Sequence, residues 1–140
     1  MPRQITHALA ALALLACAAA AHAFDLRVEV INAKSDQGKV LGAVYASPAA
    51  WLKDGQAVQV GMDAAGTKSV LVYRNLPAGA YGVSVFHDEN GNMKLDTNPA
   101  GIPIERFGFS RDARGTMGPP AFADAVVDLQ ADTTITITLH

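Results

Sequence analysis

The sequence predicts an all-β chain that folds as an antiparallel, Greek-key β-sandwich of about seven strands with one long loop insertion. Apolar and polar side chains alternate in several short segments, and no long stretch repeats apolar residues at helical spacing. The segments follow one another without intervening helices, as the strands of a sandwich do. Residues 88–124 are the exception, because they are rich in Gly, Pro and Asn and contain no clear strand. An insertion of this length in a small domain is usually functional.

The first strand is predicted over residues 24–31, where apolar side chains alternate with charged ones. One face carries Leu26, Val28 and Val30, and the other carries Asp25, Arg27 and Glu29. The next strand, residues 40–47, is more continuously apolar, so we expect it to be buried on both faces and to pair with the first strand.

Residues 47–54 form the one helical candidate, since Ser47 can cap a helix and Pro48 suits its first position. We expect a turn or two of helix here. Trp51 lies in this segment and is expected to close one end of the core rather than to stack on a ligand.

The segments on either side of DAAG, residues 63–66, both alternate, so DAAG is interpreted as a hairpin loop. Farther along, a Leu-Pro-x-Gly turn opens residues 75–88 and delivers Tyr81 to the next strand. Its hydroxyl is expected to bond back to the preceding connection, as in many sandwich domains. The last segment, residues 133–140, alternates Thr with Ile and Leu. We place it in the interior of a sheet, because an exposed edge of this composition would promote aggregation.

Residues 1–23 predict a secretory signal peptide, with a basic residue, an apolar Ala/Leu region and small residues at the end. Cleavage after Ala23 would leave one domain, residues 24–140, in the periplasm or outside the cell. The apolar region is shorter than the roughly 20 residues of a membrane span, so none is expected. A lipoprotein is the alternative, because residues 14–17 resemble a lipobox and would carry a lipid anchor on Cys17.

The mature chain would carry ten basic and 13 acidic residues, a formal net charge of −3. This mild acidity lacks the basic footprint of a nucleic-acid-binding protein. Cys17 is the only cysteine and lies in the leader, so the mature domain has no thiol for a disulfide. Zinc is not expected either, because only His87 and His140 offer nitrogen ligands after the leader.

The stretch HDENGNMKLD, residues 87–96, places oxygen-bearing residues at alternate positions, as calcium loops do. The candidate ligands are Asp88, Asn90, Asn92, the Lys94 carbonyl and Asp96. The loop is not an EF-hand, because Met93 occupies the place of the turn glycine and Pro99 stands where a bidentate glutamate belongs. Such a site would bind calcium weakly. The alternative is that the Asp and Asn side chains only stabilise a polar turn.

A second candidate site combines guanidinium and aromatic groups, which together could hold a carboxylate, a phosphate or an acidic sugar. It comprises Arg106, Phe107, Phe109, Arg111 and Arg114. In the alternative interpretation, the arginines pair with nearby carboxylates, namely Glu105, Asp112 and Asp124. Phe107, Phe109 and Phe122 would then pin the loop to the sandwich. A hydrolase using His87 and Ser110 is a further alternative, although the sequence around Ser110 lacks the last glycine of a nucleophile elbow.

The motifs HDENGNMKLDTN, GIPIERFGFS and ARGTMGPPAFADA resemble an uncharacterised family of small secreted bacterial proteins. This domain of unknown function is related in fold to transthyretin-like and carboxypeptidase regulatory-like domains. The resemblance covers essentially the mature chain and implies an immunoglobulin-like or transthyretin-like sandwich. In the family the loop reads HDENGNGKLD, so Met93 replaces a glycine here. The resemblance carries no established activity.

The leading functional hypothesis is a secreted or periplasmic, non-enzymatic binding or interaction module. Its partner would be an unknown envelope protein or a glycan, and weakly bound calcium is the one cofactor considered. The hydrolase above is the alternative from another class. A structural accessory domain of the cell envelope, without a small ligand, is the third hypothesis.

Overall fold

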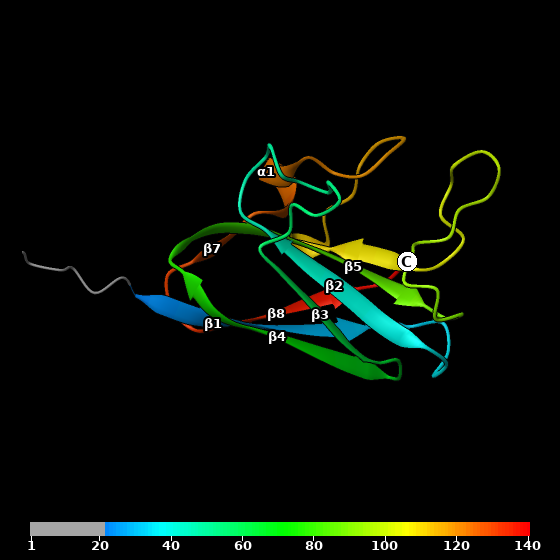
Figure 1. Cartoon of the computed structure of the whole chain (residues 1–140), viewed down its shortest axis with the longest axis horizontal. Coiled ribbons are helices and arrows are strands. Elements are labelled where there is room, and N and C mark those ends of the chain that lie inside the picture. Colours follow the sequence, from blue (N-terminus) through cyan, green and yellow to red (C-terminus); the bar gives the residue numbers. More distant parts are fainter. Residues whose placement is uncertain (1–21) are drawn as a thin grey trace, which may run out of the picture.

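The computed structural model describes residues 22–140, which form two β-sheets (Figure 1). The strands are β1 (Ala23–Ile31), β2 (Lys39–Tyr45), β3 (Gln59–Ala64), β4 (Lys68–Pro77), β5 (Gly79–Asp88), β6 (Phe107–Phe109), β7 (Val127–Leu129) and β8 (Thr133–Thr138). Two short helical segments are the 3-10 turn η1 (Ser110–Asp112) and the helix α1 (Phe122–Ala125). The predicted all-β class is confirmed. The predicted leader and Cys17 lie outside the described residues, and cleavage after Ala23 stays a prediction.

The smaller sheet has the strand order β4-β1-β8. Strand β1 pairs antiparallel with β4, with Leu26 opposite Tyr73, and parallel with β8, with Leu26 opposite Thr133. The expectation of a purely antiparallel fold is therefore wrong at one pair, the first and last strands. Period-2 alternation could not show this, because it fixes which face a side chain takes but not the direction of the neighbouring strand.

The larger sheet has the order β3-β2-β5-β6, and β7 also pairs with β5, beside its first residues. Strand β2 pairs antiparallel with β3 and β5. The predicted pairing of residues 40–47 with the first strand is thus wrong, since β1 and β2 lie in different sheets. Burial of β2 on both faces is only partly confirmed, because Val40 and Val44 are buried while Leu41 and Ala43 on the other face are half-buried.

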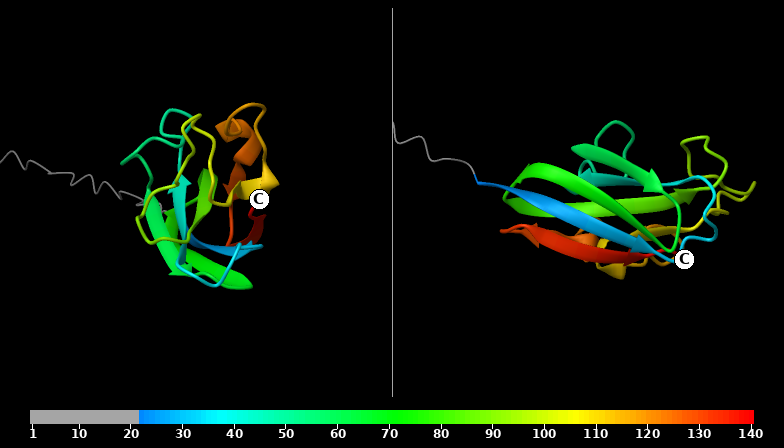
Figure 2. Two further views of the ribbon diagram at one scale, coloured as in Figure 1. Left: turned by 90° about the vertical axis from the view of Figure 1, so that its right-hand side faces the viewer. Right: turned by 90° about the horizontal axis from the view of Figure 1, so that it is seen from below.

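The two sheets face each other and enclose one apolar core, as the end-on view shows (Figure 2). The three predicted inward residues of β1, Leu26, Val28 and Val30, are all buried. Their partners in the core come from both sheets and are Val40, Val44, Ala65, Leu71, Tyr73, Leu76, Tyr81, Val83, Val85, Leu129, Ile137 and Leu139. No helix within residues 22–140 is long and apolar enough to cross a membrane.

Tyr81 begins the buried part of β5 and fixes the turn before it. Its hydroxyl donates a 2.6 Å hydrogen bond to the carbonyl of Pro77, four residues upstream. The predicted bond from Tyr81 to the preceding connection is confirmed.

The DAAG segment is a corner between the two sheets and not a hairpin loop. Strand β3, before it, pairs only with β2, and β4, after it, pairs only with β1. Asp63 holds this corner, since its carboxylate accepts hydrogen bonds from the amides of Ala64 at 2.9 Å and Val70 at 2.7 Å. Two alternating segments around a short turn predict a hairpin, but they fit a sheet-to-sheet crossing equally well.

Strand β8 lies at the edge of the smaller sheet, so its predicted place in a sheet interior is wrong. The far end of this edge is nevertheless covered. The carboxylate of Asp112 in η1 accepts a 2.9 Å bond from the amide of Thr138, and His140 exchanges two backbone bonds with Phe107 of β6. Edge amides that would invite a foreign strand are thus occupied here by the protein itself.

Residues 47–54 form a series of turns and no helix, although the predicted cap is present: the Ser47 hydroxyl accepts a bond from the Ala50 amide at 3.2 Å. Trp51 lies outside the main core, against the outer face of the larger sheet. Its indole donates a 2.9 Å bond to the Pro120 carbonyl, so this loop meets the segment before α1 (Figure 1). Trp51 therefore covers a sheet face and does not close an end of the core.

The long insertion is also more ordered than expected. It contains β6, which pairs with β5 through Phe107, Gly108 and Phe109, and it contains η1 and α1. A three-residue strand is too short to give an alternating pattern, which is why the sequence does not reveal β6.

Candidate functional site

The loop after β5 is organised by the buried carboxylate of Asp88, which is 1% exposed. One of its oxygens accepts hydrogen bonds from the amides of Gly91 at 3.0 Å and Asn92 at 3.2 Å. The other accepts one from Met93 at 2.8 Å. Three backbone donors that the tight turn would otherwise leave unpaired are thereby satisfied.

The other predicted ligands meet around Asp96. Its two carboxylate oxygens accept bonds from the side-chain amides of Asn90 at 2.6 Å and Asn92 at 2.7 Å. The Asn92 side-chain oxygen accepts the amide of Lys94, and the Asn90 side-chain oxygen accepts the amide of Asn92. The structure thus brings Asn90, Asn92 and Asp96 together, while Asp88 turns its carboxylate to the backbone of the same loop.

Glu105 closes the base of this loop, a role that the sequence analysis missed. It is 8% exposed and accepts the amides of Glu89 at 3.2 Å and Asp96 at 3.0 Å, one on each oxygen. The loop is further tied by a bridge between Thr97 and Pro103. A glutamate between Ile104 and Arg106 gives no pattern that predicts such a clamp, because its partners are backbone amides.

Within residues 22–140, no group of three or more His, Cys, Asp or Glu side chains is placed to hold a metal ion. The bonds that the Asn90 and Asn92 oxygens accept from the amides two residues farther on are those of a polar turn. Met93 has a left-handed backbone, with φ of 64°, at the position where the resembling family has glycine. The chain therefore keeps the tight winding at this position despite the side chain.

His87, the last inward residue of β5, is fully buried and holds the segment between β1 and β2. Its Nδ1 accepts the Lys34 amide at 3.2 Å, and Nε2 lies 2.7 Å from the Gln37 carbonyl oxygen, to which it donates in the matching neutral tautomer. Next to it, Glu89 accepts a 2.9 Å bond from the Ser35 hydroxyl and pairs with Lys34 at 3.3 Å. Both partners hold the pKa of the Glu89 carboxyl below its usual range, and the hydrogen bond from Ser35 has the larger effect.

Ser110 does not contact His87. Its hydroxyl bonds to the main chain of Val83 and to the carbonyl of Ala125, and the residue is fully buried. Val83 and His87 are four residues apart on β5, which corresponds to about 13 Å along a strand. The structure therefore does not bring together the pair on which the hydrolase alternative rests, and both side chains are occupied by backbone groups.

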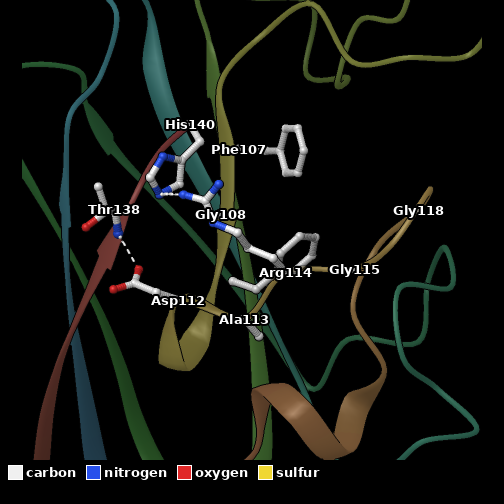
Figure 3. Close-up of a pocket in the computed structure, with 10 residues that line it drawn as sticks. Phe107, Gly108, Asp112, Ala113, Arg114, Gly115, Gly118, Thr138 and His140 are labelled. Atoms are coloured by element: carbon white, nitrogen blue, oxygen red, sulfur yellow. Dashed lines mark hydrogen bonds between the residues drawn. The ribbon is translucent and has the colours of Figure 1, made fainter.

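Part of the predicted basic and aromatic cluster lines a pocket of about 190 Å³ between β6, η1 and the end of β8 (Figure 3). Phe107, Phe109 and Arg114 belong to its walls, together with His140. The Arg114 guanidinium lies 2.7 Å from Nε2 of His140, and Figure 3 shows the two groups side by side. Phe107 and Phe109 form an edge-to-face pair with centroids 5.8 Å apart.

The remaining two arginines of the cluster point elsewhere. Arg106 donates a 2.8 Å bond to the Asn32 carbonyl, which joins the insertion to the segment after β1. Arg111 is exposed and does not line the pocket. None of the ion pairs formed within residues 22–140 joins an arginine to Glu105, Asp112 or Asp124, so the alternative pairing is wrong. Asp112 and Glu105 bind backbone amides instead.

Sequence reasoning missed His140 and Thr138 as pocket residues, because they lie more than 20 residues from Arg114 and approach it only through the pairing of the chain's end with β6. The signal that existed was local: aromatic residues at Phe107 and Phe109 share one side of a strand.

A family model described as "Uncharacterized protein conserved in bacteria (DUF2141)" matches residues 28–137. The match begins within β1 and ends within β8, so it covers both sheets, the loop after β5 and most of the pocket. No curated protein and no solved structure matches the chain.

Proposed function

Because the chain belongs to the DUF2141 family of uncharacterized proteins conserved in bacteria, we propose a function from the geometry of its sites. We propose that the protein is a secreted or periplasmic binding module, without catalytic activity, that holds an anionic group in the pocket of Arg114. The ligand class is a small carboxylate, a phosphate or an acidic sugar, free or on a glycan or envelope protein.

One observation supports this proposal above the others: the Arg114 guanidinium lines the pocket and forms no ion pair with any carboxylate among residues 22–140. The Arg114 guanidinium instead lies 2.7 Å from Nε2 of His140. The one acidic side chain in the pocket wall, Asp112, accepts the amide of Thr138 (Figure 3). A guanidinium has further donors in a planar fork that suits carboxylates and phosphates. Phe107 and Phe109 add apolar walls for the rest of a ligand.

Titration of the intact protein with glucuronate, benzoate and inorganic phosphate, followed by NMR chemical shifts, tests the pocket. Saturable shifts at Arg114, His140 and Phe107 are expected for at least one of these anions. Arg114→Gln should weaken that binding about tenfold or more, since hydrogen bonds to charged groups are worth about 1.5–3 kcal/mol. Arg111→Gln is the matched control, because Arg111 is exposed in the same segment and outside the pocket. Equal losses in both variants, or no saturable shift with any anion, would contradict the proposal.

We also infer a second candidate, weak calcium binding by the loop of Asp88, Asn90, Asn92, Lys94 and Asp96. The observation that favours it is the convergence of the Asn90 and Asn92 side-chain amides on the carboxylate of Asp96. Their NH2 groups face Asp96, so rotation of each amide would turn its oxygen toward a cation beside that carboxylate. Millimolar calcium should raise the free energy of unfolding by about 0.5–1.5 kcal/mol relative to excess chelator. Asp96→Asn should remove this effect. Asp88 is unsuitable for the test, because its carboxylate holds three amides of the turn.

If calcium and chelator give the same melting temperature, the loop is only a polar turn. Absence of both the anion and the calcium response would favour the structural accessory domain of the cell envelope.

Secretion and the kinship with transthyretin-like or immunoglobulin-like sandwiches also belong to this proposal. The leader sequence supports secretion, and the intact mass of exported protein tests it: a chain starting at Phe24 is expected, whereas a lipidated Cys17 would mean a lipoprotein. The two facing sheets support the kinship, and an experimental structure compared with such domains would test the Greek-key topology.

A further inference from the structure

The outer face of the larger sheet is unusually apolar. In a sheet with one face on the core, the opposite face normally carries polar side chains. Here most of the cross-strand partners on the outer face are apolar instead. One row contains Met62, Leu41, Phe86 and Phe107, and the next contains Val60, Ala43, Ser84 and Phe109.

Much of this face is open to solvent and hollowed. Val60 is 76% exposed and Met62 is 50% exposed, although both are apolar and lie on a regular strand. Met93, at 54% exposure, overhangs the same region from the loop after β5. Together with Leu41, Ala43 and Phe86, these residues line a groove of about 410 Å³, which falls in the range of small-molecule sites.

Tyr45 lines the groove near one end of β2, and the ammonium of Lys39 lies beside the lining residue Met62 near the other end. Tyr45 belongs to the wall and packs edge-to-face on Trp51, with centroids 5.4 Å apart. Lys39 lies on the same outward side of β2 as Leu41, and its ammonium is 3.8 Å from the sulfur of Met62. None of the ion pairs formed within the described part of the chain includes Lys39.

We propose that this groove binds a single-chain anionic amphiphile of the fatty-acid type. The alkyl chain lies along Leu41, Val60 and Phe86, where its burial and that of the exposed side chains are both favourable. The carboxylate lies at Lys39, where it meets an ammonium that has no other anionic partner in the described chain. This site is distinct from the Arg114 pocket, since the two share no lining residue.

Calorimetric titration of the intact protein with dodecanoate, below its micelle concentration, tests the proposal. One saturable site is expected, with weaker binding of 1-dodecanol and weaker still of dodecyltrimethylammonium. Lys39→Gln should weaken dodecanoate binding about twofold to fivefold, because an exposed charge pair contributes up to about 1 kcal/mol. It should leave dodecanol unaffected. Lys68→Gln, on the other sheet, is the matched control and should change neither.

A second pair of variants separates the groove from general surface effects. Val60→Asp places a carboxylate on the exposed floor and should abolish dodecanoate binding, whereas Val60→Lys should retain it. Val72→Asp, at a 39% exposed position on the outer side of β4, is the control and should bind as the wild type does.

Three results would overturn the proposal. The absence of saturable heat would show that dodecanoate does not bind, and equal affinity of the wild type and Val60→Asp would place the binding site elsewhere. Sedimentation showing that the wild type is a dimer and Val60→Asp a monomer would assign the face to a second copy of the chain.

Discussion

Two buried tyrosines of the core differ in what their hydroxyl groups contact. The Tyr81 hydroxyl donates to the Pro77 carbonyl, whereas the Tyr73 hydroxyl has no hydrogen-bond partner among the described residues. Burial raises the pKa of both phenols. Tyr73 lies beneath Gly42, where an added Cβ would come within 2.6 Å of its hydroxyl oxygen. Because glycine has no Cβ, Gly42 leaves the space that the Tyr73 phenol occupies.

Replacing each tyrosine with phenylalanine should have opposite effects on stability. Tyr81→Phe removes a formed hydrogen bond and should lower the free energy of unfolding by about 1 kcal/mol. Tyr73→Phe removes an unpaired buried hydroxyl and should raise it by about 1 kcal/mol. Urea denaturation of both variants at neutral pH measures the two changes. A loss of stability in Tyr73→Phe as large as that in Tyr81→Phe would mean that the Tyr73 hydroxyl has a partner after all.

The left-handed backbone of Met93 gives a second prediction at the scale of one residue. An L-residue in this conformation costs about 1–2 kcal/mol, and glycine avoids that cost while losing about 0.5–1 kcal/mol to its flexible unfolded state. Met93→Gly should therefore stabilise the protein by about 0.5–1 kcal/mol. Met62→Gly is the control, because Met62 is equally exposed but lies on an extended strand, and it should destabilise. Thermal melts of both variants decide the matter.

Among the elements, the loop of Trp51 and the helix α1 form a small second core outside the larger sheet. Trp51 contacts Tyr45, Phe109 and Phe122, with ring centroids 5.4 to 5.9 Å apart. The indole ring contacts the larger sheet at Gly82 of β5, where an added Cβ would lie 2.6 Å from the ring. The absence of a side chain at Gly82 thus lets the indole rest directly on the strand.

Gly82→Ala should destabilise the protein by about 2–3 kcal/mol, since a methyl group inserted at a close contact forces rings or backbone to move. The change should appear in the fluorescence of Trp51, the single tryptophan of the chain. Gly66→Ala is the matched control, because nothing lies within 4 Å of the position of its Cβ, and it should be close to neutral. If Trp51→Leu is combined with Gly82→Ala, the cost of the alanine should fall, and additive costs would mean that the two residues do not touch.

The contact between the segment after β1 and the loop after β5 should depend on pH through Glu89. Ser35 and Lys34 lower the pKa of this carboxyl from 4.5, so its contribution to stability is complete above that value. The contribution is lost as the pH falls through the lowered pKa of the folded state. The difference in unfolding free energy between the wild type and Glu89→Gln should therefore shrink on acidification. Ser35→Ala should reduce the same dependence, and a difference that stays constant with pH would contradict the assignment.

For the whole molecule, the sequence predicts well which side chains of a strand face the core, but it predicts poorly which strands pair with one another. Alternation identified the inward side chains of β1, and the Leu-Pro-x-Gly turn identified the bond from Tyr81 to Pro77. Both are local, since they depend on residues a few positions apart. The partner of β1 and the edge position of β8 depend on contacts across more than 100 residues, which no short pattern encodes.

The same limit applies to the candidate sites. The sequence predicted that Phe107, Phe109 and Arg114 would share a surface, because they are close in the chain, and they do line one pocket. It missed His140, which completes that pocket, and Glu105, whose partners are backbone amides. It also missed the groove of Lys39, because an apolar residue on an outer face looks the same in sequence as one in the core.

The parallel pairing of β1 with β8 sets the order of events when the chain is made. Ile31 of β1 lies beside Thr138 of β8, so the central strand of the smaller sheet cannot gain its full second neighbour until residue 138 has been synthesised. At about 5–20 residues per second, this leaves β1 incomplete for several seconds. A chain with such long-range pairing folds late and slowly. If the protein is exported as proposed, a chain that pairs its strands this late is still unfolded during export. Its sheets then form in the compartment to which it is exported.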